Sequence, residues 1–273
     1  MNVRLSIVVI AIIAGVCISA GCTGNTSPGT TQTPVVTTTQ LQTPSRIPTA
    51  AVPAAMLRDM ASLDQAYIPV LALTTQNDAG NSRKAIDTLM GRWAIFNSTY
   101  YRAMPGDPMW SSDFQRVNTT ISSANRLIAQ GNLTGAHTEL EQFRLIMLDL
   151  RTRNHIDYFI DKLTLFHAPM EEIVLAAQNK APEEVDTGTI REIYPAAVMA
   201  WNAVKGAEID AALFDLNETQ AAKIRTLINN ETAALDTLGT ALKTNDSALI
   251  GNVSVAIKGP FSTLFSAFGK FPG

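Results

Sequence analysis

Apolar side chains recur every three or four residues along most of the chain after residue 50. Residues 155–178 show this most clearly, with a stripe formed by Ile156, Phe159, Leu163, Phe166, Met170, Ile173 and Ala177. Side chains at this spacing lie on one face of an α-helix. The other helical segments cover about 54–76, 82–103, 111–130, 187–213, 217–243 and 246–268. No alternating strand pattern occurs, so we predict an all-α fold of about eight helices.

Capping residues place some of the helix boundaries. Asn132 is expected to cap the start of a helix, because its side chain can accept from an early free N–H. Asn217 and Gln220 have the spacing of a capping box at the start of another helix. No glycine or proline separates the segment that begins at residue 133 from His155. We therefore expect one long helix from about 133 to 178.

The chain carries an internal repeat with an offset of about 100 residues. Matched pairs include Leu63 with Leu163, Tyr67 with His167, Pro69 with Pro169 and Trp93 with Trp201. We interpret residues 51–153 and 154–273 as two tandem related antiparallel helical-bundle units, joined by the long helix. Prolines inside the first helix of each unit free the carbonyl groups of Gln65 and Leu165. The resulting kinks either shape the bundles or open a ligand cavity.

The N-terminus has the pattern of an export signal. Arg4 precedes an apolar run of 16 residues, Leu5 to Ala20, which is shorter than a transmembrane helix requires. The run ends in Ser19-Ala20-Gly21-Cys22. This ending resembles the lipobox of prokaryotic lipoprotein precursors, archaea included, and the resemblance is confined to residues 1–22 and the stalk after them. It implies cleavage before Cys22 and lipidation of that cysteine; an uncleaved signal anchor is the alternative.

Residues 23–50 are rich in threonine and proline and predict a disordered linker. Either form of the N-terminus places the helical region on the extracytoplasmic face of the cell membrane. Cys17 and Cys22 are the two cysteines of the chain, so the helical region has no thiol for a disulfide, a zinc–thiolate site or a catalytic nucleophile. The net charge of −3 makes nucleic acid an unexpected partner.

His167 is the main candidate for chemistry. Glu171 lies four residues later, so both side chains can face one way on a helix and share a metal ion. Met170 could serve as a soft ligand or as an axial ligand of a noncovalent haem. The alternative is a histidine at the edge of the core that bonds to a neighbouring helix. A histidine of that kind is the more common case.

Two further groups of residues stand out. Arg144, Arg151 and Arg153 gather near Asp149, where a solvated face is the default interpretation and an anion site the alternative. Asn-X-Ser/Thr sequons contain half of the 16 asparagines, more than the serine and threonine content predicts. The asparagines concerned are Asn25, Asn97, Asn118, Asn132, Asn217, Asn230, Asn245 and Asn252.

No nucleophile elbow, phosphate-binding glycine loop or acid–base pair of carboxylates occurs in the chain. We therefore expect a membrane-anchored, extracytoplasmic binding or interaction protein and not an enzyme, with a protein or small-molecule partner that the sequence does not identify. The alternative is a helical bundle that binds metal or haem and has a metal-handling or electron-transfer role.

Overall fold

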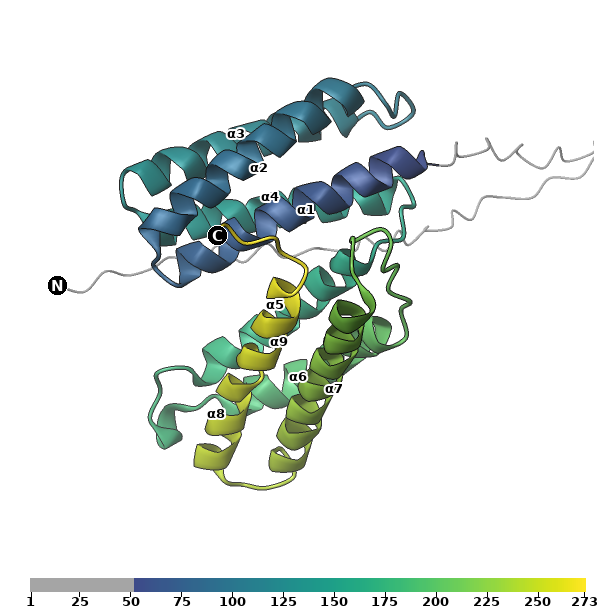
Figure 1. Ribbon diagram of the computed structural model, residues 1–273. Coiled ribbons are helices and arrows are strands. Elements are labelled where there is room, and N and C mark those ends of the chain that lie inside the picture. The colour runs from purple at the N-terminus through teal and green to yellow at the C-terminus, as the bar shows by residue number, and fades with distance from the viewer. Residues whose placement is uncertain (1–51) are drawn as a thin grey trace, which may run out of the picture. The chain divides into compact units, whose positions relative to one another are not determined.

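The computed structural model describes residues 52–273, which belong to one compact unit (Figure 1). The predictions for residues 1–22 and 23–50 lie outside the described residues. The helices are α1 (Ala54–Thr75), α2 (Ala79–Tyr100), α3 (Trp110–Ala129), α4 (Leu133–Arg153), α5 (Phe159–Ala177), α6 (Thr187–Lys205), α7 (Glu218–Ala241), α8 (Ser247–Ala256) and α9 (Lys258–Ser266), with one 3₁₀ turn at Pro182–Glu184. Residues 52–273 contain no β-strand, which confirms the all-α prediction.

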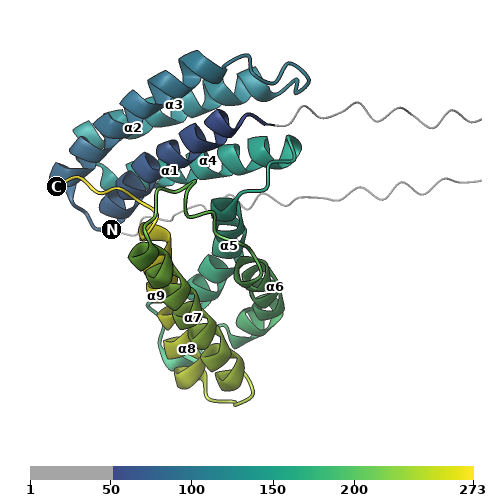
Figure 2. The same ribbon diagram turned by 45° about the vertical axis from the view of Figure 1, so that its right-hand side comes forward.

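The helices pack as two groups (Figures 1 and 2). In the first bundle, α1 packs against α2 and α4, and α3 packs against α2 and α4. In the second bundle, α5 packs against α6, α8 and α9, and α7 packs against α8 and α9. Contacts of α1 with α9 and of α4 with α5 join the two bundles. The boundary predicted at residues 153 and 154 falls where α4 ends, but the two bundles belong to one compact unit.

Each bundle has an aromatic centre that the apolar stripes bring together. In the first bundle Trp93 lies 5.2 Å from Phe114 between ring centroids, and Phe96 lies 5.6 Å from the same ring. In the second bundle Phe166 lies 4.7 Å from Trp201 and 5.5 Å from Phe261. All of these rings are buried. Burial of this apolar surface is the main favourable term for folding.

Side-chain caps begin most of the longer helices. The Asn132 side chain accepts from the Gly135 N–H at 2.9 Å, which confirms the predicted cap of α4. Asn217 and Gln220 accept from each other's backbone N–H at 2.9 Å, which confirms the capping box of α7. Asp78, Asp186 and Asp246 cap α2, α6 and α8 in the same way. Each cap satisfies a backbone donor that the helix itself leaves free.

The prediction of one long helix over 133–178 is wrong. The chain turns between α4 and α5 because His155 adopts a left-handed conformation, with φ 55°. The N–H of Ile156 then donates to the Arg151 carbonyl at 2.9 Å, and the N–H of His155 donates to the Thr152 carbonyl at 3.1 Å. This is the pair of hydrogen bonds of a Schellman motif. Glycine usually occupies the position of His155, so the sequence carries no signal for this stop.

Two other predicted boundaries also change. The helix predicted to reach residue 213 ends at Lys205, and Gly206 follows as its C-cap. The last predicted helix, 246–268, is divided at Ile257 into α8 and α9. Pro260 removes a backbone donor there, which weakens the helix at this point. Among the described residues one stretch, Ser247–Ser266, is long and apolar enough to cross a membrane, but it is interrupted at Ile257 and buries Phe261 and Leu264 in the bundle.

The carbonyl that Pro69 frees has a specific partner. The backbone N–H of Lys270 donates to the Gln65 carbonyl at 2.8 Å, so the C-terminal segment lies against the proline kink of α1. A Cβ at Gly269 would come within 3.0 Å of the Pro69 ring, so only glycine allows this approach. The side-chain amide of Gln65 donates to the Phe214 carbonyl at 2.6 Å. One turn of α1 therefore binds two distant segments of the second bundle.

Candidate functional site

His167 projects from α5 to where the two bundles meet. Its Nδ1 lies 2.8 Å from an Nη of Arg144 on α4, and its ring centroid lies 5.5 Å from that of Phe261 on α9. The side chain is partly buried, as predicted for the core edge. Burial and the neighbouring charges of Arg144 and Lys258 lower the pKa of His167 to about 2. The imidazole is therefore neutral at physiological pH.

The neutral ring has a defined tautomer. A guanidinium only donates, so Nδ1 of His167 accepts from Arg144 and the proton of the ring lies on Nε2. A histidine ligates a metal through a nitrogen without a proton. With Arg144 in place, neither nitrogen of His167 has a free lone pair. Binding a cation here would require Arg144 to move or the ring to change tautomer.

The other two predicted ligands have different surroundings. Glu171 accepts from Lys258 Nζ of α9 at 2.9 Å, and Met170 is fully buried in the core. Within residues 52–273, no group of three or more histidine, cysteine, aspartate or glutamate side chains is arranged to hold a metal ion. Metal or haem binding at His167, Met170 and Glu171 stays a prediction.

The arginine cluster is paired with carboxylates and is not a solvated face, which corrects the default interpretation. Arg144 is buried and pairs with Glu141 as well as with His167. Arg153 pairs with Asp113, with Asp149 and, at 3.2 Å, with Asp107. Periodicity alone missed this because most of the partners come from other helices or loops.

Arg151 is the most buried of the three arginines, with 1% of its surface exposed. Its guanidinium forms a two-pronged bond to Asp161 of α5, with the closest distance 2.6 Å, and lies 3.5 Å from Asp64 of α1. The Tyr158 ring covers it at 4.4 Å. Burial raises the pKa of Asp64 to about 6, although the Arg151 charge opposes this rise. Arg151 is therefore not free to bind an external anion, since Asp161 and Asp64 pair with its N–H groups and the Tyr158 ring covers one face of the guanidinium.

Glu231 is a buried carboxyl that the sequence did not single out. It lies on α7 with no exposed surface, and neither of its oxygens has a hydrogen-bonding partner. Burial raises its pKa from 4.5 to about 8, and the nearby N–H of Phe261 lowers it by a smaller amount. Glu231 is therefore mostly protonated at neutral pH. Helical spacing could have placed it on the inner face of α7, between Leu227 and Leu235.

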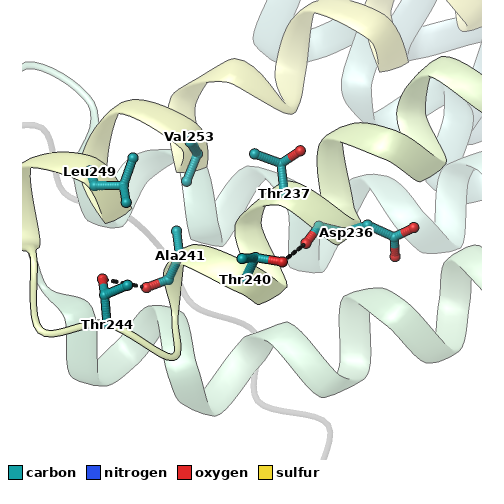
Figure 3. A pocket seen from close by; sticks show the side chains of 7 residues that line it. All are labelled: Asp236, Thr237, Thr240, Ala241, Thr244, Leu249 and Val253. Atoms are coloured by element: carbon teal, nitrogen blue, oxygen red, sulfur yellow. Dashed lines mark hydrogen bonds between the residues drawn. The ribbon is translucent and has the colours of Figure 1, made fainter.

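The hollows of the described surface are open to solvent. One of about 340 Å³ lies where α7 meets α8, and Figure 3 shows the seven side chains that line it. Thr240 donates to the Asp236 carbonyl at 3.0 Å and Thr244 donates to the Ala241 carbonyl at 2.7 Å, so these hydroxyls already have partners. A second hollow of about 580 Å³ lies where the loop between α4 and α5 meets the loop between α6 and α7.

Two leucines are exposed on the outer face of α5, where the exposed side chain of Glu172 lies between them. Leu165 and Leu175 are 55% and 50% exposed, and Ala168 lies between them on the same side of the helix. Met199 on the outer side of α6 is 72% exposed. The helix period directs these side chains away from the core. Nothing in residues 52–273 covers them.

Comparison with known proteins identified no similarity: no family model, curated protein or solved structure matches this chain.

Replacing His167 with Ala separates its two interpretations. A structural histidine leaves a cavity and takes away the acceptor of Arg144, so the free energy of unfolding should fall by about 1–3 kcal/mol. Metal content should be the same in both proteins. Melting temperature and elemental analysis of the same preparations test this. The exposed His155→Asn serves as a control, and metal present in the wild type but lost in the His167 variant would contradict the structural interpretation.

Glu231 should make stability fall with rising pH. Between pH 4.5 and about 8 the native state holds one proton more than the unfolded state. The free energy of unfolding should therefore fall by up to about 1.4 kcal/mol per pH unit in that range, and level off above it. Glu231→Gln should remove this slope, whereas Asp236→Asn at an exposed position of the same helix should keep it. Denaturant titrations from pH 5 to 9 measure the slopes; equal slopes for all three proteins would refute the assignment.

Proposed function

We propose that the chain is an exported lipoprotein, held on the extracytoplasmic face of the cell membrane by a lipid on Cys22. The observation that carries this is the run from Leu5 to Cys22: an apolar segment too short to span a bilayer, then three small residues and a cysteine. No cysteine follows Cys22 in the sequence. This agrees with export, because the mature protein would then have no free thiol to be oxidised outside the cytoplasm. The threonine- and proline-rich residues 23–50 act as a spacer.

The helical region acts as a binding or interaction module in this proposal. The support is the outward-facing apolar side chains of Leu165, Leu175 and Met199, which contribute nothing to the core of their own bundle. Exposed apolar surface on a folded domain is a common basis of partner binding. Kinked but tightly packed helices give such a face a rigid support. The partner is a protein or a small molecule.

A duplication is proposed for the origin of the two bundles. Asn77 after α1 and Asn179 after α5 both adopt positive φ, 60° and 58°. Each follows a glutamine, Gln76 or Gln178, and their separation is close to the offset of about 100 residues in the internal repeat. The first helix of each bundle contains the matched proline, Pro69 or Pro169. Two asparagines with the same rare conformation at aligned helix ends are a specific resemblance, since few non-glycine residues adopt it.

Cys22→Ser should release the protein from membranes. Without the thiol no lipid can be attached, and the mature chain has a mainly polar linker at its N-terminus. Fractionation of cells that produce the full chain, followed by detection of the protein in membrane and soluble fractions, measures this. Cys17→Ser is the matched control and should leave the protein in the membrane. If the Cys22 variant stays in the membrane with residues 1–21 attached, the anchor is an uncleaved signal.

A photoreactive amino acid at Leu175 or Met199 should crosslink to one partner of defined mass in intact cells. The apolar contact that buries these positions would bring the probe within reach of the partner. Lys223, an exposed residue of α7, is the control and should give no such product. Gel mobility and mass spectrometry of the products provide the readout. Absence of a product at both apolar positions, with the lipid anchor intact, would argue against an interaction role for this face.

A further inference from the structure

Sequons occur far more often than composition requires. Serine and threonine make up 44 of 273 residues, so random placement would put about three of the 16 asparagines in sequons, whereas eight are found there. Seven of these eight lie in the described part of the chain. Six of the seven asparagine side chains are exposed and that of Asn97 is partly exposed. The seven are Asn97, Asn118, Asn132, Asn217, Asn230, Asn245 and Asn252.

Helix capping does not account for them. Asn132 and Asn217 cap α4 and α7 through Oδ1, which leaves Nδ2 free in both. Aspartate caps α2, α6 and α8 with the same geometry, and its charge suits the positive end of a helix better. Asparagine caps two helices, and in both cases that asparagine belongs to a sequon. Asn118, Asn230 and Asn252 lie within helices, where asparagine is a poor helix former.

Ser254 gives a further reason. It is the hydroxyl residue of the sequon at Asn252, and it is fully buried with no hydrogen-bonding partner for its Oγ. A buried hydroxyl without a partner costs stability compared with alanine. Ser82 of α2 is buried without a partner as well and belongs to no sequon, so the lack of a partner for Ser254 adds to the exposure of the sequon asparagines and does not replace it. An enzyme that reads Asn-X-Ser/Thr in the extended chain has a use for the Ser254 hydroxyl.

We propose that these asparagines are acceptors for N-linked glycans, added to the exported chain before its helices form. Nδ2 of the asparagine attacks the anomeric carbon of a sugar carried on a lipid phosphate or diphosphate. The bond from that carbon to the phosphate oxygen breaks, the amide loses one proton, and the lipid phosphate leaves. No oxidation or reduction takes place. The inference rests on the export proposed above, because lipid-linked sugar donors act on translocated chains.

The sequons are unevenly distributed over the helices. The sequon asparagines lie on α2, α3, α7 and α8, at the caps of α4 and α7, and just before α8 at Asn245, while α1, α5, α6 and α9 contain none. Leu165 and Leu175 of α5 and Met199 of α6 are all on helices without a sequon. Glycans at these sites would therefore not be attached to the helices that carry Leu165, Leu175 and Met199.

Mass spectrometry of the full chain, isolated from the cells that encode it, tests the proposal. Peptides that contain Asn118, Asn230 and Asn245 should carry a hexose- or hexosamine-based mass, and the intact protein should exceed its sequence mass. Asn229 precedes Asn230 on the same exposed part of α7 but has Glu231 two residues later, so it should remain unmodified. Asn230→Gln should remove one glycan, and Asn229→Gln should remove none.

Ser254 supplies the second pair of variants. Ser254→Ala should abolish the glycan at Asn252 without lowering the melting temperature, whereas Ser254→Thr should keep the glycan. Sequon peptides that are all unmodified would overturn the inference. The N-terminal peptide of the same sample distinguishes failure of the glycosylation proposal from failure of the export proposal. An N-terminus at lipidated Cys22 together with unmodified sequons rejects glycosylation alone. Retention of Met1–Gly21 on a cytosolic chain rejects the proposed export and, with it, the glycosylation.

Discussion

The buried guanidinium of Arg151 holds three helices in register. It comes from the last turn of α4 and pairs with Asp161 in the first turn of α5 and with Asp64 in the middle of α1. Burial alone would lower the pKa of Arg151, but the two carboxylates raise it, so the cation persists inside the protein. Leaving any of these charges unpaired would cost several kcal/mol. The position of α5 relative to α1 and α4 is therefore strongly restricted.

This constraint explains the turn that replaces the predicted long helix. A helix continued through Asn154 would carry Asp161 past the end of α4 and away from Arg151. The left-handed His155 reverses the chain instead, and Tyr158 then covers the guanidinium with its ring. Left-handed conformation at a non-glycine residue is unfavourable by about 1–2 kcal/mol. The pairing of Arg151 and the burial of Ile156 and Tyr158 offset that cost.

The junction of the two bundles is also where the candidate chemistry lies. The Gln65 carbonyl, freed by Pro69, binds the C-terminal segment, and Arg144 of α4 donates to His167 of α5. These bonds satisfy polar groups that would otherwise be buried without partners. His167 is thus neutral and already engaged in a contact between the bundles. The exposed apolar side chains of Leu165, Leu175 and Met199 take no part in these contacts.

The sequence alone determined the all-α fold, the caps at Asn132 and Asn217, and the buried faces that contain Phe166, Met170 and Trp201, because helical period and capping are local properties of the chain. It also placed the freed carbonyl of Gln65. Tertiary structure decided what each of these groups meets: Lys270 for Gln65, Arg144 for His167, and Asp64 with Asp161 for Arg151. These partners are 10 to 205 residues apart in the chain, and the stop at His155 depends on them. No local pattern encodes such pairings, since they arise only when the bundles pack and exclude water.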